Sequence, residues 1–264
     1  YTFSTTGTPR VFNAASLAPE IGYFSNKGSA LDQYASLSIA DKGILDSAAN
    51  MIAFIAGDQA NVGTVFRDRQ KVLGDIVHSR PAYIKAPPYG YTDTGYSNYV
   101  QSNANRQGVV YVGANDGMLH AFAGLTGAEK WAYVPKLLMP ELYRLAEKNY
   151  LSKHRFFVDG EPQISDVKFG SDWKTILVIG MGKGGKGYAA LDITDPDNPR
   201  TLWEFCQSAS LCGTHSDPNL GYSFGNPIIT KWKPLGSTTE KWVVIVTSGH
   251  NNSDGSSNTT NGDG

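Results

Sequence analysis

The chain has 264 residues, a formal net charge of −1 and 41% hydrophobic residues, which is enough apolar material for a sizeable core. It contains no run of about 18 apolar residues, which excludes a membrane-spanning helix, and its balanced charge argues against a basic nucleic-acid-binding surface. The 29 Gly, 13 Pro and 14 Tyr residues favour a β protein rich in turns.

Residues 1–70 are predicted to form a lead-in segment with one helix over 41–56. Asp41 can cap this helix, apolar residues recur along one of its faces, and Gly57 can end it. A shorter helix is predicted over 137–150.

From residue 71 onward the chain repeats one pattern of short strands. A proline opens a strand, a β-forming run and a Gly-rich turn follow, and a strand of small residues leads through a further turn to a strand that carries Trp. The predicted units are 71–136, 156–207 and 220–264, and Trp131 and Trp203 are the structural residues that end the first two. Four strands with an aromatic residue at a fixed place are typical of β-propeller blades. The predicted fold is therefore all-β, a β-propeller with a short helical N-terminal segment.

The chain supplies about two and a half blades, whereas a propeller needs about four to eight to close. An open stack would leave strand edges unpaired and one apolar face uncovered. We therefore expect the ring to continue beyond residue 264, in the same polypeptide or in another chain. The start at Tyr1 and the polar run over 250–264 also suggest a removed leader or a piece of a longer protein.

Two cysteines, Cys206 and Cys212, lie six residues apart without a surrounding metal motif. A zinc site needs about four N or S ligands, so this pair does not make one. A local disulfide is sterically easy at this spacing and is typical of an exported protein. Two reduced thiols in a cytosolic protein are the alternative.

Other motifs have more ordinary explanations than the chemistry that they suggest. Residues 180–185 match GxGxxG and residues 221–225 match GxSxG, but a strand follows each of them where a nucleotide site or a hydrolase needs a helix. The charged group of Asp58, Arg67, Asp68 and Arg69 is predicted to be a solvated loop. No two histidines have metal-ligand spacing, and no catalytic residue is predicted; the histidines are His78, His120, His154, His215 and His250.

The polar tail offers oxygen atoms that suit Ca²⁺, and its weak candidate ligands are Asp254, Asn258 and Asp263. The tail lacks a third carboxylate and a closing bidentate Glu, so a polar loop without metal is the alternative. Two long insertions, 87–106 and 140–155, are predicted to emerge from the ring as contact surfaces. The first is rich in tyrosine, as recognition surfaces often are, although a tolerated insertion is the alternative; its tyrosines are Tyr89, Tyr91, Tyr96 and Tyr99.

Several of these motifs resemble the PilC/PilY family of type IV pilus tip-associated proteins, and the resemblance covers about residues 20–264. They are Val72-Leu-Gly-Asp-Ile-Val-His-Ser-Arg-Pro, Tyr111-Val-Gly-Ala-Asn-Asp-Gly-Met-Leu-His-Ala-Phe, Phe157-Val-Asp-Gly-Glu-Pro and Leu220-Gly-Tyr-Ser-Phe-Gly-Asn-Pro. The units also resemble the wider group of quinoprotein-dehydrogenase-like propellers.

The resemblance implies a seven-bladed propeller at the C-terminal end of a large exported protein at the pilus tip, in the periplasm or on the outer membrane surface. It implies a non-enzymatic role with minor pilins in pilus extension, twitching motility and attachment to surfaces or host cells. Family members bind Ca²⁺ in an Asp-rich loop, and we expect that loop to lie beyond residue 264 because no strong copy of it occurs here.

Two other functions are compatible with a propeller. A quinone-cofactor dehydrogenase commonly has adjacent cysteines beside its cofactor, whereas Cys206 and Cys212 are not adjacent. A periplasmic scaffold propeller unrelated to pili would differ from a pilus protein in not binding minor pilins.

Overall fold

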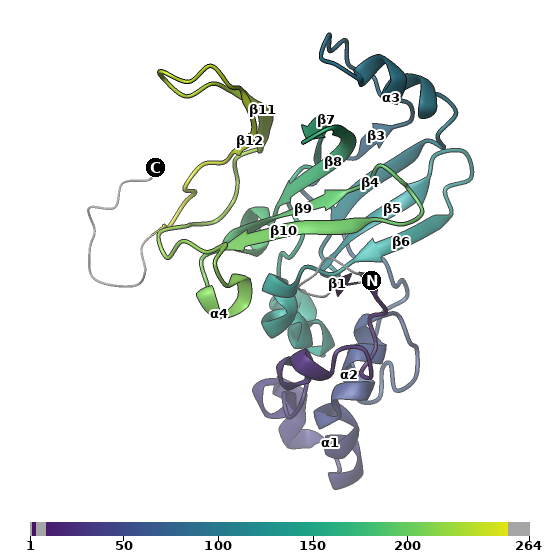
Figure 1. The fold of residues 1–264 in the computed structure, drawn as a ribbon. Helices are drawn as coiled ribbons and strands as arrows, with labels where there is room; N and C mark the ends of the chain where they lie inside the picture. Colours follow the sequence, from purple (N-terminus) through teal and green to yellow (C-terminus); the bar gives the residue numbers. More distant parts are fainter. Residues whose placement is uncertain (1, 4–8, 253–264) are drawn as a thin grey trace.

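Short helices, two four-stranded antiparallel sheets and a two-stranded hairpin follow one another along the chain (Figure 1). The computed structural model describes residues 2–3 and 9–252. The predicted short helical N-terminal segment is present, but further short helices lie between the strands, so the part after it is not purely β. The sheets of the described residues form no closed ring. None of the helices in this part has the length and apolar character to cross a bilayer.

The lead-in segment contains one strand pair, three 3-10 helices and two α-helices. Its elements are β1 (Thr2–Phe3), β2 (Pro9–Arg10), η1 (Ala18–Tyr23), η2 (Gly28–Ala30), η3 (Asp32–Ser36), α1 (Ile39–Asp46) and α2 (Ala48–Ile55). The prediction of a single helix over 41–56 is wrong, because the backbone of Ser47 is extended, with φ −72° and ψ 118°. Ser47 ends α1 and caps α2, since its hydroxyl accepts a hydrogen bond from the Asn50 N–H.

The first helix also begins earlier than predicted. Ser38 is its cap, and the Ser38 hydroxyl oxygen accepts a hydrogen bond from the Asp41 N–H at 3.1 Å. Asp41 therefore lies in the first turn of α1, where its negative charge favours the helix N-terminus.

The charged group after α2 is the predicted solvated loop only in part, because Asp58 and Asp68 are exposed whereas Arg67 and Arg69 are partly buried. The guanidinium of Arg69 lies 4.0 Å from the ring centroid of Phe54, and that of Arg67 lies 3.9 Å from the ring centroid of Tyr150. Burial lowers the pKa of both arginines. Cation–π contacts thus hold this segment against Phe54 on one side and against Tyr150, which follows the first sheet in the chain, on the other.

The first sheet has the order β3-β4-β5-β6, and all of its neighbouring strands are antiparallel. Its strands and the helix inserted after β3 are β3 (Ala82–Ile84), α3 (Tyr96–Ser102), β4 (Val109–Ala114), β5 (Met118–Ala123) and β6 (Glu129–Tyr133).

The second sheet has the order β10-β9-β8-β7, and a hairpin of two strands follows it. The remaining elements are η4 (Lys136–Ala146), η5 (Tyr150–Ser152), β7 (Gln163–Phe169), β8 (Asp172–Gly180), η6 (Gly182–Gly184), β9 (Gly187–Asp192), β10 (Arg200–Cys206), α4 (Ala209–Cys212), β11 (Ile228–Trp232) and β12 (Lys241–Ile245).

The helix predicted over 137–150 is instead the 3-10 helix η4, which ends at Ala146. Pro140 lies inside it, has no N–H to donate and crowds the preceding turn, so a regular α-helix does not form there.

The sheets pack through alternating strand residues, which point to opposite faces. Leu177 and Ile179 of β8 point toward the first sheet, are fully buried and belong to the main core. Ile176 and Val178 point the other way and pack with β12 of the hairpin in a second, smaller core. Each such aliphatic side chain stabilises the fold by about 1.5–3 kcal/mol, so the second sheet is held from both sides.

Candidate functional site

The structure contains the predicted disulfide between Cys206 and Cys212, whose Cα atoms are 5.9 Å apart. The short helix α4 lies inside the closed loop. The bridge ties the end of β10 to the segment that leads toward the hairpin, as expected of a protein from an oxidising compartment.

The two tryptophans occupy matching places in their sheets, since Trp131 lies opposite Ala121 and Trp203 lies opposite Ala190. Trp131 is 4% exposed, and its indole N–H donates to the carbonyl of Pro196, which joins the first sheet to the second. Trp203 is only half-buried and lines an apolar cleft of about 800 Å³ between the second sheet and the hairpin.

The three predicted calcium ligands, Asp254, Asn258 and Asp263, lie outside the described residues. Within residues 2–3 and 9–252 no group of three or more His, Cys, Asp or Glu side chains could hold a metal ion.

The first glycine motif lies in the turn between β8 and β9 of the second sheet, and the second motif lies in the segment between that sheet and the hairpin. Gly184, in the first motif, approaches residue 157 so closely that a Cβ would lie 1.9 Å from the Phe157 carbonyl oxygen. Ser223, the serine of the second motif, is 1% exposed. Its hydroxyl accepts from the Met181 N–H at 2.8 Å and donates to the Gly187 carbonyl at 2.7 Å. Both motifs therefore join strands and turns.

We call the residues that lead into β3, β7 and β11 the approach segments; they are 75–80, 156–161 and 221–226. The second and third segments lie on the turn of the preceding sheet. The Val158 N–H donates to the carbonyl of Ala114 at the end of β4, and the Ser223 N–H donates to the carbonyl of Gly185 in the β8–β9 turn, both at 3.4 Å. We call these two places the first and the second junction; in each of them a main-chain N–H of the approach segment bonds to the preceding sheet.

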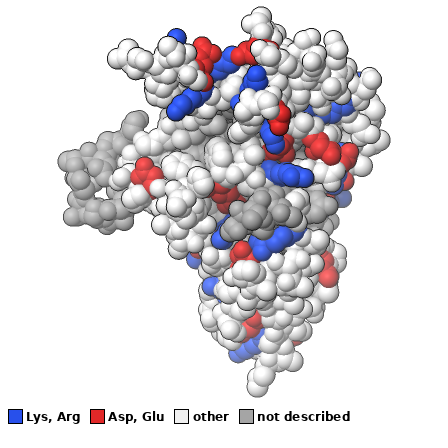
Figure 2. All heavy atoms as spheres, in the orientation of Figure 1, with Lys and Arg blue, Asp and Glu red and all other residues white. Residues whose placement is uncertain are grey.

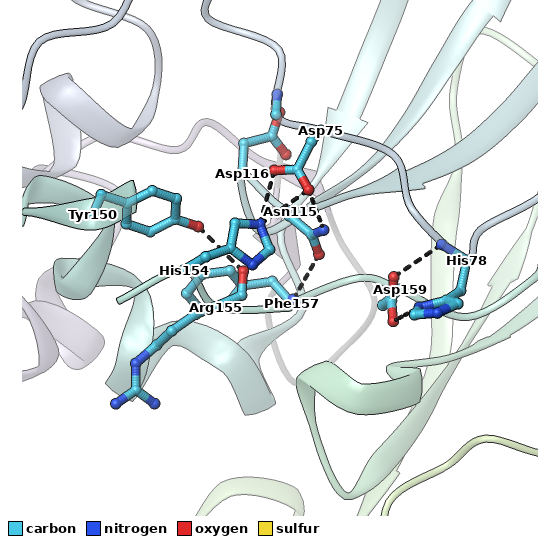
Figure 3. A network of polar contacts seen from close by, with 10 residues as sticks. Asp75, His78, Asn115, Asp116, Tyr150, His154, Arg155, Phe157 and Asp159 are labelled. Atoms are coloured by element: carbon cyan, nitrogen blue, oxygen red, sulfur yellow. Dashed lines mark hydrogen bonds and ion pairs between the residues drawn. The ribbon is translucent and has the colours of Figure 1, made fainter. Parts of the chain in front are cut away.

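Figure 3 shows the polar contacts around the first junction. The Asn115 side chain donates to Asp75 at 2.9 Å and accepts from the Phe157 N–H at 3.0 Å. His154 contacts the same Asp75 carboxylate at 3.0 Å. Partial burial acts to raise the pKa of Asp75, but the hydrogen bonds from Asn115 and His154 outweigh it and lower the pKa. One asparagine therefore links two approach segments.

A second contact in Figure 3 joins the first two approach segments directly. The imidazole Nδ1 of His78 lies 2.7 Å from the buried carboxylate of Asp159, and the His78 N–H donates to the same carboxylate. A catalytic triad would add a nucleophile to such a pair. Within the described residues no hydrogen bond joins His78 to a Ser, Thr or Cys side chain, so the contact acts as a link between segments.

His120 forms a buried ionic group that the sequence did not indicate. Its Nδ1 lies 2.6 Å from Glu129, its Nε2 lies 3.1 Å from Asp116, and the residue is 4% exposed. Burial alone would lower the pKa of His120, but the hydrogen bonds and charges of the two carboxylates raise it to about 9. Asp116 lies four residues before His120, in the β4–β5 turn. This short spacing is the only sign in the sequence that the two side chains could interact.

The tyrosines of the first insertion do not form an exposed contact loop, and that prediction is wrong for them. Tyr96 donates to the fully buried Asp166 at 2.7 Å, and Tyr99 shares a 2.7 Å hydrogen bond with Thr175. Burial, and then the hydrogen bond to Asp166, raises the pKa of Tyr96.

Tyr91 extends these contacts to the hairpin. Its ring centroid lies 5.6 Å from that of Trp173 in β8 and 5.4 Å from that of Trp242 in β12. We call Tyr89, Tyr91, Tyr96 and Tyr99 the tyrosine bridge, because they leave the first sheet after β3 and pack on the second sheet and the hairpin.

The outer surface has no large region of one charge on the face shown in Figure 2, where basic and acidic side chains are interspersed. The polar groups of the junctions are engaged with one another, so they hold the sheets in fixed positions.

Comparisons with known proteins identify the family to which the chain is similar. A family model described as the PilY1 beta-propeller domain matches residues 73–262. A type IV pilus biogenesis factor PilY1 homolog of Xylella fastidiosa is 37% identical over 234 residues, and the type IV pilus biogenesis factor PilY1 of Pseudomonas aeruginosa strain PAK is 37% identical over 208 residues. These matches cover 84% and 75% of the chain but only 18% and 17% of the relatives, so the chain spans less than a fifth of their length.

The crystal structure of the Pseudomonas aeruginosa PilY1 C-terminal domain is also similar. It is 32% identical in sequence with a TM-score of 0.47, and the match covers 65% of this chain and 32% of that one.

Proposed function

The chain belongs to the PilY1 family of type IV pilus biogenesis factors, and we propose that it is a non-enzymatic propeller portion of a protein at the pilus tip. Residues 1–70 are its lead-in segment, and 71–264 form an incomplete propeller with blades over 71–136, 156–207 and 220–264. Further strands, from the same or another chain, complete the third blade and the ring.

The family match over residues 73–262 is the observation that carries this proposal. The two junctions support it, because in each of two successive approach segments a main-chain N–H donates to a carbonyl of the preceding sheet. The matching positions of Trp131 and Trp203 also support it, since a third blade placed like the second would cover Trp203 as the second sheet covers Trp131.

The proposed role is to support pilus assembly and extension, twitching motility, and attachment to surfaces or host cells, through contact with minor pilins. The disulfide between Cys206 and Cys212 is consistent with export to the periplasm and the outer membrane surface. The interspersed surface charges favour a protein partner over nucleic acid.

A non-enzymatic role is supported by what the candidate reactive groups do. Ser223 is engaged with two main-chain groups, and His78 is paired with Asp159 of the next segment. The proposal includes calcium bound outside this segment, because the sequence contains no strong copy of the family's Asp-rich calcium loop.

Deletion of the gene in its own host tests the role. The deletion should strongly reduce surface pili and twitching, the intact gene should restore both, and the tagged protein should retain minor pilins on affinity capture. A variant with Leu125→Ser is the matched control, because Leu125 is 99% exposed in the β5–β6 turn. Normal pili and twitching without the gene would contradict the proposal, and so would quinone-dependent oxidation of an alcohol by the purified protein.

A further inference from the structure

A cavity of about 520 Å³ with mostly basic walls lies beside the first junction. Its cationic side chains come from the 3-10 helix η4, from the residues just before the second approach segment and from the β8–β9 turn; they are Arg144, Lys153, Arg155 and Lys183. All four are exposed or half-buried, so a molecule in solution can reach them. Glu147 is the one acidic residue among the described residues that line the cavity.

The charge of one of these cations is already compensated. Lys153 lies 3.6 Å from the carboxylate of Glu147, which is 4% exposed, and it also donates a hydrogen bond to Asp32. The Glu147 carboxylate in turn accepts a hydrogen bond from the Asp32 N–H. These three residues form a closed network, so this part of the wall has no positive charge to offer to a ligand.

The other three cations share a single carboxylate. Arg144 and Arg155 both contact Glu141, at 2.6 and 3.7 Å. Lys183 has no acidic partner in the part of the chain that the structure describes, and its ammonium lies 4.5 Å from the ring centroid of Phe156. Positive charge is therefore in excess on this part of the wall.

The main chain holds Lys183 in position before any ligand arrives. Gly182 has a φ of 58°, which glycine adopts readily and other residues rarely do, and Gly184 lies against the Phe157 carbonyl. Figure 3 shows that the Arg155 side chain points away from the polar contacts of the junction. Side chains placed in this way lose less conformational entropy when they bind a partner.

We propose that this cavity binds an acidic peptide segment of a protein partner, whose neighbouring carboxylates contact Arg144, Arg155 and Lys183. A guanidinium group matches a carboxylate with two parallel hydrogen bonds, and the lysine ammonium adds a third donor group. The inference rests on the proposed function, because it assigns a chemistry to the contact with pilus proteins.

The size of the cavity and the charge of the chain favour a peptide over other anions. Sites for organic ligands have volumes of about 300–1,000 Å³, and this cavity lies within that range, whereas a single phosphate ion would leave most of it empty. Nucleic acid requires an extended basic surface, and the chain has a net charge of −1 with interspersed charges on the face shown in Figure 2.

Binding of a labelled peptide to the whole polypeptide tests the proposal. The probe is a short fluorescent peptide of alternating glutamate and serine, and the same peptide with glutamine in place of glutamate is its uncharged counterpart. Lys183→Gln and Arg155→Gln should each weaken binding of the glutamate peptide about 10-fold, because each removes a charge-assisted hydrogen bond. Lys233→Gln is the matched control and should bind like the wild type, since Lys233 is an exposed lysine between β11 and β12.

Several results would overturn the proposal. They are equal binding of the two peptides, an unchanged affinity of Lys183→Gln, and tighter binding of inorganic phosphate or a single-stranded oligonucleotide than of the glutamate peptide. The deletion strain tests the pilus function separately. A protein that restores pili but does not bind the glutamate peptide would contradict the cavity proposal alone, whereas normal pili without the gene would contradict the pilus function.

Discussion

Replacing His120 by glutamine should remove a pH-dependent part of the stability of the first sheet. The imidazole lies between Asp116 and Glu129, is 4% exposed, and is held in its charged form by these two carboxylates. Glutamine has a similar size and can still donate to a carboxylate, but it does not titrate. The variant therefore removes the proton while largely keeping the packing.

The magnitude follows from the pKa of His120, which is raised from 6.5 to about 9 in the folded chain. A tenfold change in proton affinity corresponds to about 1.4 kcal/mol, so the protonated imidazole and its carboxylates contribute about 3 kcal/mol. Because the folded pKa is the higher one, this contribution is fully present below about pH 6.5 and is lost as the pH rises through about 9.

Urea unfolding between pH 6 and pH 9.5 measures this effect. The free energy of unfolding of the wild type should fall by about 3 kcal/mol more over this range than that of His120→Gln. His154→Gln is the control and should keep the wild-type dependence, because His154 is an exposed histidine of the first junction. A parallel pH dependence of the wild type and His120→Gln, or an NMR titration midpoint of His120 below pH 7, would refute the reasoning.

Three further predictions concern the joints between the sheets. Replacing Cys206 and Cys212 by serine should lower the free energy of unfolding by about 2 kcal/mol, because a short loop is released in the unfolded chain, and reduction should add two hydrogens to the mass of the wild type. Asn115→Ala should cost about 1–3 kcal/mol in urea unfolding, because the buried Phe157 N–H loses its acceptor. Gly184→Ala should open the first junction to proteolysis, because its Cβ would lie 1.9 Å from the Phe157 carbonyl oxygen.

Matched variants control two of these changes. Asn115→Asp keeps an acceptor for the Phe157 N–H and should cost less than Asn115→Ala. Gly43→Ala lies in helix α1 with open space around its new Cβ, and should be neutral or slightly stabilising. Equal losses for a variant and its control would contradict the stated causes.

The sequence was sufficient for features that depend on residues close together in the chain. The strands around the turn at Asn115 and the pairing of Cys206 with Cys212 are both found in the structure. Strand alternation and turn residues predict such features, because the register of a hairpin depends on residues that are close together in the chain.

Contacts between distant residues were not predictable in the same way. The break at Ser47 allows α2 to pack its apolar residues against η4. This break depends on tertiary packing, so the helical periodicity of the sequence does not predict it. The tyrosine bridge was interpreted as a recognition loop because its composition is that of a surface. Its partners, Asp166 and Trp242 among them, lie in other sheets.

The tyrosine bridge also constrains the order in which the fold can be completed during synthesis. Asp166, the partner of Tyr96, is made 70 residues later, and Trp242, the partner of Tyr91, is made later still. A chain emerging N-terminus first therefore has finished strands of the first sheet while its four tyrosines still face water. A protein that binds exposed aromatic side chains would be most useful during this interval, which ends when β12 reaches the bridge.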